Sequence, residues 1–241
     1  MNGIKVNLVC LSFAGGNKYS YRYLNEKAPS FLNIITLEYP GRGTRLHEPL
    51  ISDMDKLVED LYKQVKPVSE RGERYAIYGH SLGGLTAYAL TQKLLKNHHR
   101  LPERIFITGT TGPSSSSRSE KRRSLMPREE FIKEIKELGG MPEEILKSEE
   151  MLNFLEPILR NDFSLSETYA YEAHAPLDIP LTVITGSDED MEREDILLWQ
   201  KESSQPVDFK ELPGGHFFIM EHTDQLLSII SKRLKKGISY E

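Results

Sequence analysis

The sequence is poor in cysteine, in long apolar runs and in excess basic charge. Its one cysteine, Cys10, permits no intramolecular disulfide and no cysteine-based metal cluster, and it is expected to be a small buried hydrophobe. No apolar stretch reaches the roughly 18 residues that a membrane-spanning helix needs. The formal net charge of −5 argues against nucleic acid as a partner, because phosphate-binding proteins usually carry a basic excess.

The N-terminus enters strand-like sequence directly, without the layout of a signal peptide. We therefore expect a cytoplasmic protein with no membrane partner. A chain of 241 residues with 38% hydrophobic content is long enough for one substantial core. Residues 1–241 are accordingly expected to form a single domain.

Short apolar, β-rich runs alternate with helix-like segments along much of the chain. Such alternation predicts parallel strand pairing through crossover helices, in an α/β fold with a mostly parallel, doubly wound sheet. The expected helices include residues 51–65 and 82–95, and the expected strands are residues 5–13, 33–39, 74–80, 104–110, 181–186 and 207–212.

The alternation stops at about residues 113–175, where helical spacing occurs around Phe131, Ile135 and Leu138 without convincing strands. An insertion at this point lies over the carboxyl ends of the strands, where sheets of this kind bind ligands. We therefore expect a helical lid.

A pentapeptide with the pattern Gly-x-Ser-x-Gly occurs at Gly79, Ser81 and Gly83. It follows an expected strand and precedes an expected helix, which is the context of the nucleophile elbow in the α/β-hydrolase fold. Ser81 is thus a candidate nucleophile, the alternative being a serine in an ordinary glycine-rich turn.

A serine nucleophile needs a base, and a carboxylate to orient that base. His216 follows the last expected strand on a glycine-rich loop and is favoured over His222, whereas His80 is expected to point away from the site. The loop after strand 181–186 carries three acidic residues in a row, at 188–190, of which one can face the histidine. The order serine, acid, histidine is that of the α/β-hydrolase fold.

Two backbone amides are candidates for an oxyanion hole. One is that of Phe13 or Ala14 in the turn after the first strand, and the other is that of Leu82 after the nucleophile. Neither Gly-x-Gly-x-x-Gly nor Gly-Lys-Ser/Thr occurs nearby, so the glycines of this turn give no reason to expect a nucleotide cofactor. No cofactor or metal site is expected.

Six ordered segments resemble the type II thioesterases that accompany nonribosomal peptide synthetases and polyketide synthases. The resemblance implies hydrolysis of stalled acyl thioesters on the phosphopantetheine arm of a carrier protein, by a monomeric enzyme without a cofactor of its own. The matching segments are residues 13–16, 39–43, 79–84, 138–142, 157–162 and 214–217.

The resemblance also implies roles for individual residues. The nucleophile falls on Ser81 and the base on His216. In the catalytic cycle that we expect, the amides of Ala14 and Leu82 hold the oxyanion. The acid is where the sequence departs from the family, which usually has aspartate three residues after the strand-end glycine. That count lands on Glu189, whereas a common family spacing from Trp199 favours Asp188. We place Asp188 slightly ahead of Glu189, and Asp190 third.

Other interpretations of the sequence stay open at this point. The basic cluster Arg118, Lys121, Arg122 and Arg123 either docks an acidic carrier protein or is a solvated loop. The same catalytic residues also suit a general carboxylesterase or lipase, or an acyltransferase. A hydrolase-fold protein that only binds a partner is the alternative from another class.

Overall fold

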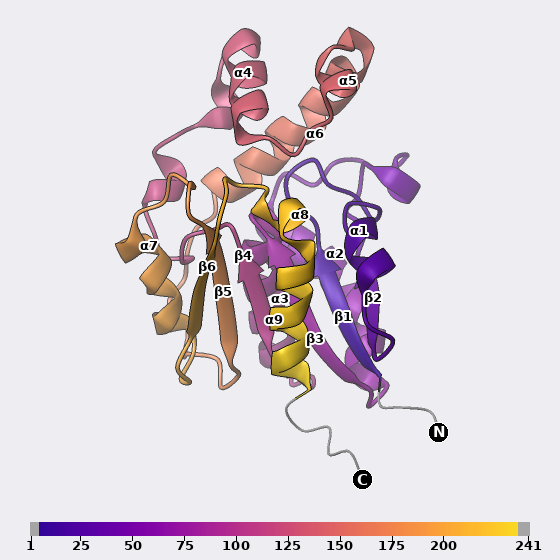
Figure 1. Cartoon of the computed structure of the whole chain (residues 1–241), viewed down its shortest axis with the longest axis vertical. Coiled ribbons are helices and arrows are strands. Elements are labelled where there is room, and N and C mark those ends of the chain that lie inside the picture. Colours follow the sequence, from indigo (N-terminus) through magenta and orange to yellow (C-terminus); the bar gives the residue numbers. More distant parts are fainter. Residues whose placement is uncertain (1–4, 236–241) are drawn as a thin grey trace.

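The computed structural model describes residues 5–235, which form a six-stranded sheet flanked by helices (Figure 1). All five strand pairs are parallel and their order is β2-β1-β3-β4-β5-β6, which confirms the predicted doubly wound α/β class. The strands are β1 (Val6–Leu11), β2 (Leu32–Thr36), β3 (Arg74–His80), β4 (Ile105–Thr108), β5 (Leu181–Gly186) and β6 (Asp208–Leu212).

Both faces of the central strands are buried because side chains alternate between two apolar layers. In β1, Val9 and Leu11 belong to one layer, and Leu8 and Cys10 to the other. The first layer is covered by α2 (Met54–Glu70), α3 (Leu82–Lys96) and the segment of α7 (Arg193–Leu197) with the 3₁₀ helix η4 (Leu198–Glu202).

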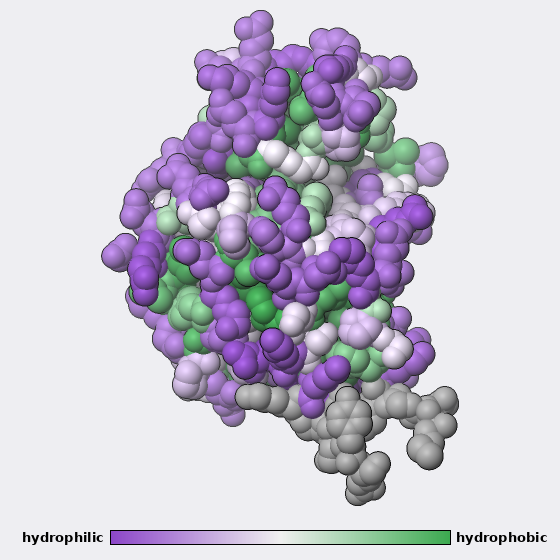
Figure 2. Space-filling model, in the orientation of Figure 1, coloured by the Kyte–Doolittle hydropathy of each residue, from purple (hydrophilic) through white to green (hydrophobic). Residues whose placement is uncertain are grey.

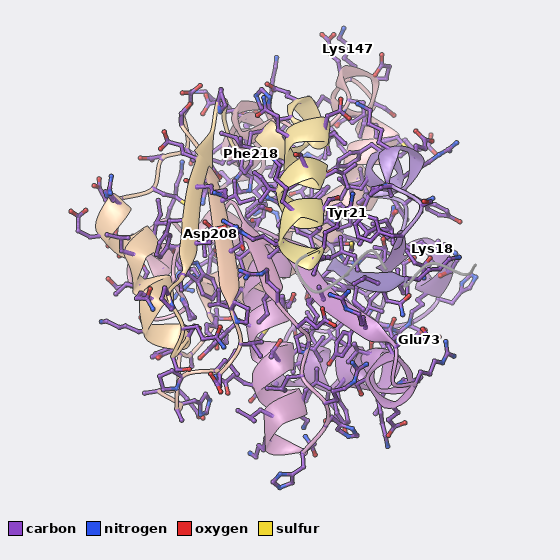
Figure 3. The ribbon with its side chains drawn as sticks, turned by 60° about the horizontal axis from the view of Figure 1, so that its bottom comes forward. Lys18, Tyr21, Glu73, Lys147, Asp208 and Phe218 are labelled. Carbon is purple, nitrogen blue, oxygen red and sulfur yellow. The ribbon has the colours of Figure 1, made fainter. Side chains whose placement is uncertain are left out.

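The second layer is covered by α1 (Arg22–Lys27), α8 (Phe218–Glu221) and α9 (Thr223–Leu234). Tyr21 and Phe218 are fully buried in this layer and are seen on either side of α9 in Figure 3. Segments from opposite ends of the chain thus close the same face of the sheet.

Between β4 and β5 the described chain is helical, as predicted. The helices of this insertion lie beyond the carboxyl ends of the strands (Figure 1). Its elements are η2 (Ser117–Ser119), η3 (Arg123–Leu125), α4 (Arg128–Leu138), α5 (Glu143–Leu146) and α6 (Glu149–Glu167). A further 3₁₀ helix, η1 (Gly43–Arg45), lies in the loop between β2 and α2.

The strand order reverses beside β1, since the chain runs from β1 outward to β2 and then returns to β3 on the other side. Loops that leave β1 and β3 in opposite directions open a crevice at the carboxyl ends of the strands. Of the helices within residues 5–235, none combines the length and hydropathy of a bilayer-crossing helix.

Candidate active site

Ser81 lies in a sharp turn between β3 and α3. Its φ of 55° is in the left-handed region, which only one other non-glycine residue of the described chain adopts. The turn requires the glycines on either side, because a Cβ on Gly79 would overlap the carbonyl oxygen of Gly83, and one on Gly83 that of Leu11. The backbone strain and the two glycines are those of a nucleophile elbow.

His216 follows β6 on the glycine-rich loop and lies against Glu189 from the loop after β5. Nδ1 of His216 is 2.6 Å from Oε1 of Glu189, whose side chain is only 3% exposed. The other carboxylate oxygen accepts a hydrogen bond of 2.7 Å from the amide of Gly186. A carboxylate on Nδ1 fixes the ring tautomer and leaves Nε2 free for chemistry.

The preference for Asp188 as the partner of His216 is wrong. Asp188 is exposed, and its carboxylate accepts a hydrogen bond of 2.8 Å from the hydroxyl of Ser187. Asp190 is exposed as well. The tight turn after Gly186 directs these two side chains outward, and the longer side chain of Glu189 reaches back to His216.

His80 also lies within the site, contrary to the expectation that it points away. Its ring centroid is 4.7 Å from that of His216, and its Nδ1 is 2.9 Å from Oγ1 of Thr108. Burial, followed by the nearby His216, lowers the pKa of His80 well below its ordinary value, so its ring is neutral. Gly109 makes room for this packing, since a Cβ there would overlap the ring of His80.

The two predicted oxyanion donors lie at the ends of β1 and β3. Leu82 is the first residue of α3, so its amide has no partner within the helix. Ala14 lies in a turn that is closed by a 2.9 Å hydrogen bond from the amide of Gly16 to the carbonyl of Phe13. Ala14, Ser81 and His216 line one cavity, and Leu82 directly follows Ser81.

This cavity has a volume of about 320 Å³ and mostly apolar walls. The sheet side contributes Phe13 and Phe217 from its loops and Met220 from α8, and the insertion supplies the rest of the apolar wall. Figure 2 shows a mainly hydrophilic outer surface on the insertion, with hydrophobic residues between its helices and at its junction with the body. The apolar residues from the insertion include Ile135, Leu138, Met141, Ile145, Leu155, Leu159 and Phe163.

The side chains of the basic cluster mainly form hydrogen bonds and ion pairs within the segment between β4 and β5. Arg118 donates hydrogen bonds to the carbonyls of Thr111, Gly112 and Pro113, and burial lowers its pKa to about 10. Lys121 and Arg123 both pair with Glu134, and Arg122 is exposed. The docking hypothesis therefore loses the support of three of its four charges.

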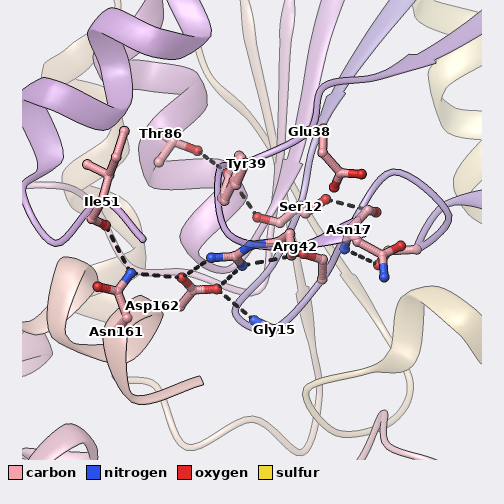
Figure 4. Close-up of polar contacts among 12 residues, drawn as sticks. Ser12, Gly15, Asn17, Glu38, Tyr39, Arg42, Ile51, Thr86, Asn161 and Asp162 are labelled. Carbon is pink, nitrogen blue, oxygen red and sulfur yellow. Dashed lines mark hydrogen bonds and ion pairs between the residues drawn. The ribbon is translucent and has the colours of Figure 1, made fainter. Parts of the chain in front are cut away.

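Sequence reasoning assigned no role to Arg42 or Asp162, which form a buried ion pair beside the Phe13–Gly16 turn (Figure 4). Both belong to segments that carry the family resemblance. The available signal was that Arg42 and Asp162, of opposite charge, both lie in these segments.

The chain is similar to known proteins over nearly its whole length. A family model described as "Thioesterase domain" matches residues 6–234. A relative from Brevibacillus parabrevis, named "Linear gramicidin dehydrogenase LgrE", is 32% identical and covers 96% of this chain and 88% of its own length.

Two solved structures are also similar. ClbQ from the colibactin NRPS/PKS pathway is 30% identical with a TM-score of 0.89, covering 96% of this chain and 98% of its own. The type II thioesterase BorB from the borrelidin biosynthetic cluster is 27% identical with a TM-score of 0.86, and the match covers 95% of this chain and 93% of BorB.

Proposed function

Because the chain belongs to the thioesterase family, we propose that it is a type II thioesterase that hydrolyses stalled acyl thioesters on the phosphopantetheine arms of carrier proteins. The observation that carries the proposal is the cavity in which Ser81, in its strained turn, lies with His216, itself hydrogen-bonded to Glu189. The pathways named for ClbQ and BorB support a synthetase as the partner.

In the proposed reaction His216 removes the proton of Ser81 as the serine oxygen bonds to the thioester carbonyl carbon. The carbonyl oxygen gains the electron pair, and the amides of Ala14 and Leu82 stabilise it. The carbon–sulfur bond then breaks, and the departing thiolate takes the proton from His216. Water, deprotonated by His216, releases the acid and restores the serine.

The composition of the cavity supports an aliphatic acyl group as the part of the substrate that it holds. Apolar side chains such as Leu155 and Phe163 stabilise a buried hydrocarbon by about 0.8 kcal/mol per methylene group. A charged acyl group would lose its hydration against these walls without a partner. We therefore expect fatty or other apolar acyl groups to be preferred over charged ones.

The test is hydrolysis of acyl-carrier thioesters by wild type and by Ser81→Ala. We expect the variant to lose at least about 10³-fold in kcat and to resist labelling by a fluorophosphonate, while its Tm stays near that of wild type. Hydrolysis at the wild-type rate by Ser81→Ala would rule out the proposed mechanism.

Substrate comparison separates the proposal from its alternatives. Acyl-carrier thioesters, acyl-coenzyme A and oxygen esters are compared by kcat/KM, with an added alcohol or amine to reveal acyl transfer. A separate assay of NADH and NADPH oxidation is included because one relative is named a dehydrogenase. Preference for oxygen esters would favour a carboxylesterase, and absence of any turnover and labelling would favour a binding protein.

A further inference from the structure

A buried carboxylate of the insertion reaches the turn that carries the proposed oxyanion donor Ala14. Asp162 on α6 is fully buried, and one of its oxygens accepts a 2.8 Å hydrogen bond from the amide of Gly15 (Figure 4). The same oxygen accepts a hydrogen bond from Nη1 of Arg42, and the other lies 2.8 Å from Nη2. Both oxygens of this carboxylate are therefore engaged.

Arg42 holds the same turn from a second direction. Its side chain is 5% exposed, and Nη1 also donates to the carbonyl of Gly16 at 3.4 Å. The guanidinium lies 5.3 Å from the centre of the Tyr39 ring, whose hydroxyl donates to the carbonyl of Ser12. Burial opposes the charge on Arg42, but the hydrogen bonds and charge of Asp162 outweigh it and raise the pKa of Arg42.

These contacts fix the peptide units on both sides of Ala14. The amide of Gly15, in the unit after Ala14, is directed to Asp162. The amide of Gly16 donates to the carbonyl of Phe13, which belongs to the same planar peptide unit as the Ala14 amide. An oxyanion donor must lie within about 2.7–3.1 Å of the developing charge. A small rotation of this turn would therefore lose its hydrogen bond.

The insertion contacts the turn with an apolar group as well. Leu159 is one helical turn before Asp162 on α6, and a Cβ on Gly15 would overlap its side chain. Displacement of α6 would therefore remove the Asp162 hydrogen bond and the Leu159 packing together.

A buried ion pair is poor evidence of a purely stabilising role, because apolar replacements are often equally stable. We propose that Asp162, held by Arg42, is a positioning residue that fixes the Phe13–Gly16 turn so that the Ala14 amide meets the oxyanion. This inference rests on the proposed function, in which Ser81 forms a tetrahedral adduct. It also makes the geometry of the oxyanion site depend on the position of α6 against the Phe13–Gly16 turn.

The test compares Asp162→Asn with wild type on a p-nitrophenyl ester and on an acyl-carrier thioester. We expect kcat to fall by about 100-fold on both substrates, with KM changed less than about threefold, as for loss of one oxyanion donor. Affinity for an acyl trifluoromethyl ketone, whose adduct carries the oxyanion, should fall by a similar factor. Affinity for the corresponding free acid should not.

Two further measurements separate positioning from folding. The final extent of fluorophosphonate labelling gives the fraction of competent molecules, and kcat is expressed per labelled site. Arg42→Lys keeps the positive charge but loses the guanidinium group that binds both oxygens of Asp162, so it should show a smaller loss of kcat in the same direction. It also serves as the test variant if Asp162→Asn does not fold.

The matched control is Asp60→Asn, which breaks the ion pair between Arg45 and Asp60 away from the turn. A lower Tm without a change in kcat per labelled site, in Asp162→Asn or in Arg42→Lys, would overturn the positioning role. Failure of the proposed function is distinct, because wild type itself would then be unlabelled or inactive on the thioester.

Discussion

The two sides of the cavity differ in chemistry. Loops at the carboxyl ends of the strands supply the proposed catalytic groups Ser81, Glu189 and His216, whereas the insertion supplies mostly apolar side chains such as Leu155 and Phe163. Under the proposed function, we expect bond breaking to depend on the strand-end loops and acyl recognition to depend mainly on the insertion. Substitutions on the sheet side should change the rate for every substrate, and substitutions in the insertion should change which acyl group is preferred.

The strongest test on the sheet side is Glu189→Gln. Glutamine keeps the size of the side chain but removes the charge that stabilises the imidazolium and holds the tautomer of His216. We expect kcat to fall by about 10²- to 10⁴-fold for short and long acyl thioesters alike. The matched control is Asp188→Asn on the same loop, which should change kcat less than about threefold. A large loss of kcat in Asp188→Asn, with little change in Glu189→Gln, would restore Asp188 as the acid.

This ranking could not be obtained from the sequence, which identified the acidic loop but not the residue. The choice depends on the turn after Gly186, where Asp188 is directed to solvent and Glu189 to the histidine. Counting residues along a loop does not reveal side-chain direction. The tilted contact between the rings of His80 and His216 was missed for the same reason.

The strands and the elbow were predictable because their signals are local. Apolar runs gave all six strands within a few residues, and glycines at 79 and 83 are demanded by close backbone contacts next to Ser81. The insertion was predicted only as helical. Its buried ion pair with the sheet side joins Arg42 and Asp162 across 120 positions, and no short pattern encodes such a pair.

On the insertion side, the sharpest comparison is Leu155→Asn against Phe154→Asn. Leu155 lines the cavity, whereas Phe154 is the next residue of α6 and is 48% exposed. An amide in the cavity loses hydration when a hydrocarbon chain is bound. We expect kcat/KM for an octanoyl thioester to fall by about 10- to 100-fold in Leu155→Asn, with little change for acetyl.

The control Phe154→Asn should leave both substrates near wild type. If Leu155→Asn lowers acetyl and octanoyl hydrolysis equally, the separation of chemistry from recognition is incorrect. Thermal unfolding of both variants is measured alongside, so that the kinetics are compared between folded proteins.

The smallest expected effect concerns the stability of the sheet side as a function of pH. Burial and then the nearby His216 lower the pKa of His80, so the folded protein keeps this ring neutral. Below pH 6.5 the unfolded chain binds a proton at this position that the folded chain does not, and the free energy of unfolding decreases as the pH falls. Between pH 7.5 and 5.5 the loss from one such group is on the order of 1 kcal/mol.

Replacing His80 with asparagine removes this titration, so the decrease in unfolding free energy between pH 7.5 and 5.5 should be about 1 kcal/mol smaller in His80→Asn than in wild type. Urea unfolding at the two pH values measures it. His47→Asn, which removes an exposed histidine, is the control. An equal change in the two variants would contradict a buried neutral His80, because only a ring shielded from water resists protonation as the chain around it is acidified.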